Sequence, residues 1–333
     1  MKRSIPLGFV SVGLISVALW AGLSNFTQRP VQPKSLPSNT NVVIASKVAA
    51  GMSPAIADIK STAKAGDIVQ ASLHARFVGA KDLGAAYNEF GALAVTNPDA
   101  IYYQALSSLI CMNFSGGVLK SLEASVEQDP LTQVGKRRSE ALGKLKTACA
   151  TMPPSAHDFR FQRAMIDAAS RGDPKGIAVL LGMELPTSEA DYKTASKSAE
   201  SLAYSRDPVV FANLGHYFER RDGLAQWQIP GVEGNTSGKE MAAAFHLFAC
   251  DLGDDCSATS FNQLAICARM GQCDYRDRFA DFQRNKLTPD AYDRVQRIRD
   301  VIGDGLTSRT WPIAFWIGVE KVPGTMARMN SKH

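Results

Sequence analysis

The chain has 333 residues, a net charge of +5, 45% hydrophobic residues and 21% charged residues. This length suffices for one large or two ordinary domains with a sizeable core, and the composition is ordinary for a folded soluble protein. The basic residues form no block of five or six like charges, which excludes a basic arm for nucleic acid, so we expect no nucleic-acid partner.

The N-terminus has the pattern of an export signal. Met1-Lys2-Arg3 is basic, and residues 5–23 carry no charge and are rich in Val, Leu, Ile and Gly. Such a run is close to the roughly 20 residues that cross a bilayer. The best cleavage site, Leu19-Trp20-Ala21, fits the preferred small-residue pattern poorly. The pattern therefore favours an uncleaved anchor in the inner membrane over a cleaved signal peptide, and in both cases the rest of the chain is exported, to the periplasm in a Gram-negative bacterium.

Composition divides the chain into four parts. Residues 1–24 form the signal anchor or signal peptide. Residues 25–60 are rich in Pro, Ser and Asn, with few large apolar residues, and are predicted to be a flexible tether. Residues 61–320 are predicted to form one all-α ectodomain, and residues 321–333 a loose C-terminal tail.

Almost only helical signals follow the tether. Asp67 and Asp82 are predicted N-cap residues of two helices. Asn97-Pro98 opens a third helix, because proline suits the first helical position after a polar cap. Gly116-Gly117 is predicted to end the third helix, Asp129-Pro130 to break a shorter fourth, and Arg137 to Cys149 to form a fifth.

The second half of the chain continues in the same way after one irregular insert. Ile229 to Lys239 contains one proline and three glycines and is predicted to be a surface loop. Ser237 and Glu240 have the spacing of a capping box, which restarts helix. The helix Met241 to Cys250 is apolar almost all round and is expected to be central. Further predicted helices are Phe261 to Met270 and the run after Thr288-Pro289, and the aromatic residues Trp311, Phe315 and Trp316 are expected to cover the end of the core.

Two segments share the pattern D-P-x-x-x-A-x-L. Asp173-Pro174 and Asp207-Pro208 lie 34 residues apart. Together with Ala168-Ala169 and Leu181-Gly182, the first segment resembles the Sel1-like branch of the tetratricopeptide-type helical repeats over about residues 168–217. The second segment departs from that pattern, with Arg206 in place of the family's glycine. The resemblance implies stacked helix pairs with a concave surface for a partner.

Four of the six cysteines are predicted to staple the two turns of a helical hairpin. Cys250 ends one predicted helix and Cys256 precedes the next, and Cys267 and Cys273 stand in the same relation. We therefore expect the disulfides Cys250–Cys256 and Cys267–Cys273, although the spacing leaves the two other pairings open. A zinc site is the alternative, but five residues between paired ligands exceed the usual two to four.

The remaining cysteines, Cys111 and Cys149, end two helices on the same side of an up-down-up arrangement, so a third disulfide can form between them. An even number of cysteines behind an export signal is typical of an oxidising compartment.

Few residues indicate chemistry. His216 and Glu219 lie three residues apart, which places them on one helical face. The pattern favours a surface polar pair, with an acid-base or metal pair as the alternative, and these two residues are the functional candidates. His246 lies between apolar neighbours and is expected to be a hydrogen-bonded core histidine. The sequence lacks the nucleophile, phosphate-loop and dinucleotide motifs, so we expect no catalytic residue, no metal and no cofactor.

The sequence as a whole predicts an all-α protein of helical hairpins stacked in an α-solenoid-like array, stapled by disulfides and tethered to a membrane. The favoured function is a non-catalytic binding or scaffolding protein of the cell envelope, with a protein partner and with the membrane contacted through the N-terminal segment. The alternatives are a hydrolase of envelope polymers, with its site near the insert 229–239, and a chaperone for exported proteins.

Overall fold

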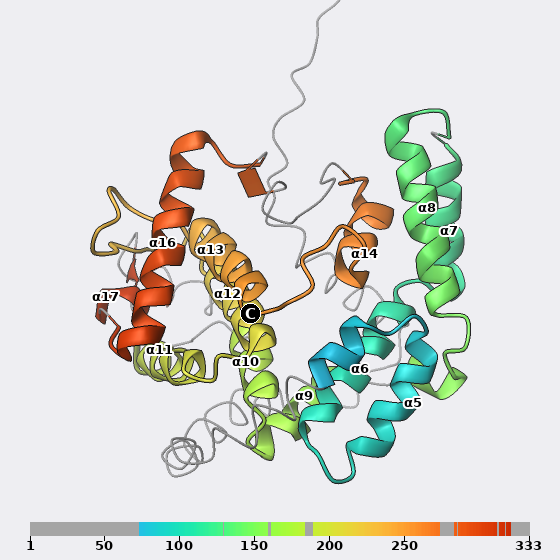
Figure 1. Cartoon of the computed structure of the whole chain (residues 1–333), viewed down its shortest axis with the longest axis horizontal. Helices are drawn as coiled ribbons and strands as arrows, with labels where there is room; N and C mark the ends of the chain where they lie inside the picture. Colours follow the sequence, from blue (N-terminus) through green and yellow to red (C-terminus); the bar gives the residue numbers. More distant parts are fainter. Residues whose placement is uncertain are drawn as a thin grey trace, which may run out of the picture. The chain divides into compact units, whose positions relative to one another are not determined.

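The structure is a computed structural model that describes residues 73–128, 130–158, 161–183, 189–273, 283–284, 286–311, 313–316 and 318–320. The chain divides into two units, Met1–Leu36 and Pro37–His333, and every described residue belongs to the second. These residues are mostly helical, in agreement with the predicted class (Figure 1). The predicted anchor 5–23, the tether 25–60, the cap Asp67 and the tail 321–333 lie outside the described residues.

Among the helices that the structure describes, none combines the length and apolarity needed to cross a membrane.

The first group of helices follows a short helix over residues 73–78. The caps act as predicted: the Asp82 carboxylate accepts hydrogen bonds from the backbone N–H groups of Gly84 and Ala85. Packing joins α5 to α6 and α7 to α8. The elements are α5 (Leu83–Leu93), α6 (Asp99–Met112), α7 (Gly116–Glu127), α8 (Gln133–Ala148) and the 3₁₀ helix η2 (Pro154–Asp158).

Two predicted boundaries in this group were wrong. Gly116-Gly117 begins α7 instead of ending α6, which already stops at Met112. Gly116 has φ +55°, a backbone conformation that glycine adopts without strain, so it makes the turn between the two helices. The next helix starts at Gln133, four residues before the predicted Arg137, because the Thr132 hydroxyl caps it.

The second group forms most of the core. The Asp207, Ser237, Ser260 and Thr288 side chains cap the helices that follow them, and Ser237 and Glu240 form the predicted capping box. The central helix α13 packs against both α12 and α16, as its all-round apolar sequence predicts. The elements are α9 (Phe161–Ser170), α10 (Pro174–Met183), α11 (Glu189–Ala203), α12 (Pro208–Glu219), α13 (Gly238–Asp251), α14 (Phe261–Met270), α16 (Pro289–Ser308) and α17 (Ile313–Trp316).

Aromatic side chains fill the centre of this core. Phe218 of α12 and Phe245 of α13 have ring centroids 4.9 Å apart, and Trp316 lies 6.0 Å from Phe218. The three aromatic residues that the sequence predicts at the end of the core, Trp311, Phe315 and Trp316, are all buried in the same cluster.

A small sheet, which the sequence did not predict, closes this end of the core. Strand β1 (Ala225–Gln226) pairs antiparallel with β2 (Val319–Glu320), with Ala225 opposite Glu320. The insert after β1 is only partly a surface loop. Trp227 exchanges two backbone hydrogen bonds with Thr236, which folds the insert back on itself, and Ile229 and Val232 are buried.

Candidate functional site

The predicted pair lies on α12 as the spacing requires. The Nδ1 atom of His216 is 3.5 Å from Oε2 of Glu219. The His216 side chain is 39% exposed and the Glu219 side chain 18% exposed, so the pair is open to solvent on one side. The imidazole can hydrogen-bond to the carboxylate and to water.

A third side chain joins this pair from the neighbouring helix. His246 of α13 packs edge to face against His216, with 4.9 Å between ring centroids. The close approach requires Gly215, because a Cβ atom there would lie 2.8 Å from Nε2 of His246. The sequence indicates His246 only as a hydrogen-bonded core histidine, and its contact with His216 lies across a helix-helix packing that the sequence does not reveal.

The two imidazoles have different electrostatic environments. Burial lowers the pKa of His246 to about 3 from 6.5, and the neighbouring His216 acts in the same direction while Glu219 opposes it. His246 is therefore neutral at physiological pH. Among the residues that the structure describes, no three His, Cys, Asp or Glu side chains are arranged to hold a metal ion.

The low pKa of His246 predicts a pH-dependent stability. The folded-state pKa lies below that of the unfolded chain, so the stabilisation is complete above pH 6.5 and is lost as the pH falls from 6.5 toward 3. Between pH 7 and pH 5, the free energy of unfolding should fall by about 2 kcal/mol less in the variant His246→Phe than in the wild type. Urea denaturation at a series of pH values checks this, and parallel curves for wild type and His246→Phe would contradict it.

A second, buried cluster surrounds Lys175 of α10. Its Nζ atom lies 2.9 Å from Oδ2 of Asp207, and the side chains are 0% and 5% exposed. Asp207 also caps α12, and Asp173 caps α10 by accepting from the N–H groups of Lys175 and Gly176. Three helix starts therefore meet at one lysine, because Asp99, the first residue of α6, interacts electrostatically with it as well.

The charges in this cluster depend on one another. Burial raises the pKa of Asp173 to about 7, Lys175 opposes that rise, and Asp99 adds to it through its charge and a hydrogen bond. Burial alone would lower the pKa of Lys175, but the carboxylates of Asp207, Asp99 and Asp173 outweigh it and raise that pKa. The lysine thus stays charged. The stabilisation from the raised pKa of Asp173 is complete below pH 3.8 and is lost as the pH rises through about 7.

A carboxyl with a pKa near 7 suits general acid-base catalysis, but Asp173 is only 2% exposed. Asp173 accepts hydrogen bonds from the backbone of its own helix and shares one with Asp99, and Lys175 opposes the rise in its pKa. We therefore interpret the cluster as a buried electrostatic link between α6, α10 and α12. The recurring Asn-Pro and Asp-Pro pairs were the sequence signal for the three helix starts. No signal pointed to Lys175.

All three predicted disulfides are confirmed. Cα–Cα distances are 5.4 Å for Cys111–Cys149, 5.7 Å for Cys250–Cys256 and 4.7 Å for Cys267–Cys273. No cysteine is left free, so the alternative zinc site has no thiolate ligand. Disulfide bonds fit an oxidising, extracytoplasmic location.

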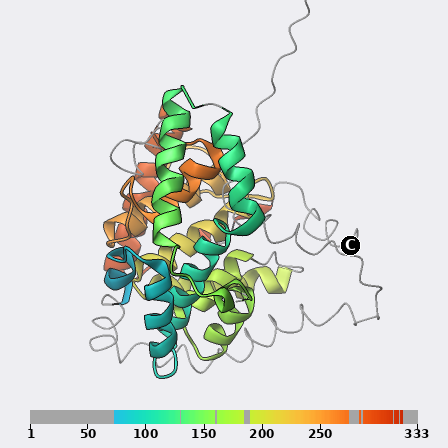
Figure 2. The same ribbon diagram turned by 90° about the vertical axis from the view of Figure 1, so that its right-hand side faces the viewer.

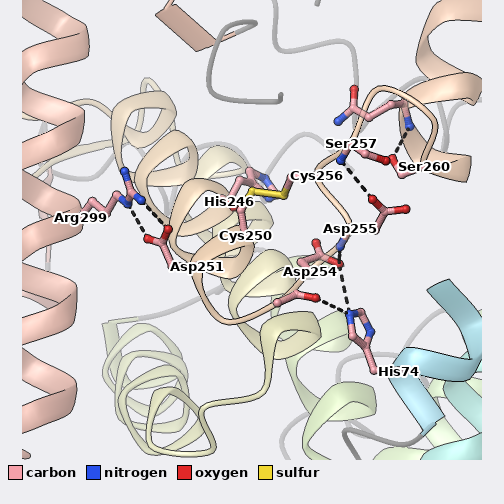
Figure 3. The surroundings of a disulfide bond; sticks show 12 residues. His74, His246, Cys250, Asp251, Asp254, Asp255, Cys256, Ser257, Ser260 and Arg299 are labelled. Carbon is pink, nitrogen blue, oxygen red and sulfur yellow. Dashed lines mark hydrogen bonds and ion pairs between the residues drawn. A yellow bond between two sulfur atoms is a disulfide. The ribbon is translucent and has the colours of Figure 1, made fainter. Parts of the chain in front are cut away.

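The Cys250–Cys256 bond organises a contact with the first described helix (Figure 3). Nε2 of His74 lies 3.2 Å from the carbonyl oxygen of Gly253 and 3.7 Å from Oδ1 of Asp254. At the other side, Arg299 of α16 forms a two-pronged ion pair with Asp251. The segment between the two cysteines therefore connects the first described helix to α16.

None of the protein-family models, curated proteins and solved structures compared with the chain matches it, so its function is argued from its own residues.

Proposed function

We propose that the protein is an exported, non-catalytic protein of the cell envelope that binds a protein partner. Three disulfides support export, because such bonds persist in oxidising compartments. Residues 5–23 would provide the export signal and the anchor in the inner membrane. The helix pairs would stack as in the Sel1-like repeats that residues 168–217 resemble, and present a surface to the partner.

The α7–α8 hairpin carries this proposal. Its two helices lie side by side in both views (Figures 1 and 2). Leu131, in the turn between them, is 87% exposed, and the nearby Val134 is 38% exposed. Apolar side chains left exposed together at one tip are a common feature of protein-binding surfaces.

The hairpin is also held in place close to this tip. Arg138 of α8 donates to the carbonyl oxygen of Ala268 in α14, and Arg137 donates to that of Cys273. A docking tip that is already held in place loses little conformational entropy when a partner binds.

Photo-crosslinking in the native host tests the proposal. A photoreactive amino acid at Leu131 is expected to give a discrete protein adduct, and the same residue at Asp304, an exposed position on α16, is expected to give none. Adding Val134→Glu should reduce the Leu131 adduct about tenfold, because it places a charge in the apolar contact. The absence of an adduct at Leu131, or equal adducts at both positions, would refute the proposal.

The hydrolase alternative finds less support. Within residues 229–239, all of which the structure describes, Glu233 is the one acidic residue and no histidine or cysteine occurs. The flanking carboxylates are engaged elsewhere: Asp222 pairs with Lys239, and Glu240 pairs with Arg294. A hydrolase site needs at least two catalytic groups within reach of one bond.

A further inference from the structure

Two of the disulfides are matched in size but not in burial. Cys250–Cys256 and Cys267–Cys273 both join residues six positions apart. Cys267 and Cys273 are 7% and 6% exposed, whereas both Cys250 and Cys256 are partly exposed. The entropy of loop closure is therefore the same for both bonds. They differ in how easily an attacking thiolate reaches a sulfur atom.

We propose that Cys250–Cys256 is a thiol-exchange site, and that its reduction by a dithiol releases the contact between His74 and the loop 252–256. A thiolate of the dithiol attacks one sulfur of the bond, the S–S bond breaks, and the departing sulfur takes up a proton. The second thiol of the reductant then displaces the mixed disulfide. Two electrons and two protons pass to Cys250 and Cys256, and the reductant leaves as a disulfide.

The segments joined by this bond explain what its reduction would change. Cys250 and Asp251 belong to α13, and the ion pair of Asp251 with Arg299 holds that end without the disulfide. Cys256 lies beyond the helix, in irregular chain that the disulfide ties back to α13. After reduction α13 would stay in place, and two backbone hydrogen bonds, from the N–H groups of Gly253 and Asp254 to the carbonyl oxygens of Cys250 and Ala249, would hold this part of the loop in place of the covalent bond.

The electrostatics of Asp254 favour opening once the bond is broken. Burial raises the pKa of this carboxyl, and His74 partly opposes the rise. An ionised Asp254 is therefore held where its hydration is incomplete, and movement of the loop into water restores it. A reduced Cys250 can remain in place, since its Sγ atom lies 3.2 Å from the carbonyl oxygen of His246, to which a thiol can donate.

The first arm of the test uses the unmodified full chain. The protein is treated with increasing dithiothreitol under native conditions, quenched with one alkylating reagent, fully reduced, and labelled with a second. Peptide mapping is expected to show Cys250 and Cys256 reduced at least about tenfold faster than Cys267 and Cys273. Equal rates, or faster reduction of Cys267–Cys273, would overturn the proposal.

The second arm measures the release of His74 by amide hydrogen exchange. After selective reduction, exchange in residues 73–79 should rise at least about tenfold, while exchange in α14 stays unchanged. The variant Cys250→Ser/Cys256→Ser should reproduce this result, and Cys267→Ser/Cys273→Ser should affect α14 instead. Unchanged exchange in residues 73–79 after confirmed reduction of Cys250–Cys256 would refute the release, even if the double variant fails to fold.

Discussion

Replacement of Lys175 by methionine is expected to lower the free energy of unfolding by about 3–5 kcal/mol at pH 8. The substitution keeps most of the side-chain volume but removes the only cation that the described residues place against Asp207 in this cluster. Asp207 would then be a buried carboxylate without a counter-charge, near Asp173 and Asp99. Urea denaturation with intact disulfides measures the loss.

Two variants separate this effect from general disruption. The double variant Lys175→Met/Asp207→Asn should lose less free energy of unfolding than the two single variants together, because Asp207→Asn removes the buried charge that Lys175→Met leaves unpaired. Arg171 lies four positions before Lys175 and forms a surface ion pair with Asp167, in which the two side chains are 44% and 50% exposed. The variant Arg171→Met should therefore lower the free energy of unfolding by less than about 1 kcal/mol.

The destabilisation by Lys175→Met should also depend on pH. The loss from Lys175→Met should be smaller at pH 5.5 than at pH 8, because Asp173, whose pKa is raised to about 7, is then protonated and repels Asp207 less. A loss at pH 8 no larger than that of Arg171→Met would show that the buried pair does not link the helices.

Local signals predicted most of the helical structure. Asp82, Asp207 and Thr288 each cap the helix that the sequence assigns to them, because an N-cap depends on residues within one turn. The disulfide pairing was predictable for a related reason. Once helix ends are known, antiparallel neighbours place only certain cysteines side by side.

Contacts between distant segments could not be predicted in this way. The meeting of Lys175 with Asp99 and Asp207 depends on how three helices pack, and the edge-to-face contact of His216 with His246 depends on the small size of Gly215. Strands β1 and β2 are two residues each and lie about ninety positions apart, too short for a periodic signal.

Removal of the Cys111–Cys149 disulfide is expected to have an effect of similar size to loss of Lys175. Its loop spans 38 positions, and the loop-entropy relation gives about 4 kcal/mol, against about 2 kcal/mol for each six-position loop. The variant Cys111→Ala/Cys149→Ala should therefore unfold at a lower urea concentration than Cys267→Ala/Cys273→Ala. Equal midpoints would show that the entropy of the unfolded chain does not govern the difference.

The same bond defines the base of the α7–α8 hairpin. Cys111 lies in the last turn of α6 and Cys149 follows the last residue of α8, so the disulfide joins the two ends of the segment that presents Leu131. In Cys111→Ala/Cys149→Ala, amide exchange should rise throughout α7 and the photo-adduct at Leu131 should weaken. In Cys250→Ala/Cys256→Ala, whose disulfide lies outside this segment, a smaller change is expected. A hairpin that stays protected in the first variant would be held by its contacts with α14 alone, and the tip would then be positioned by packing instead of by the disulfide.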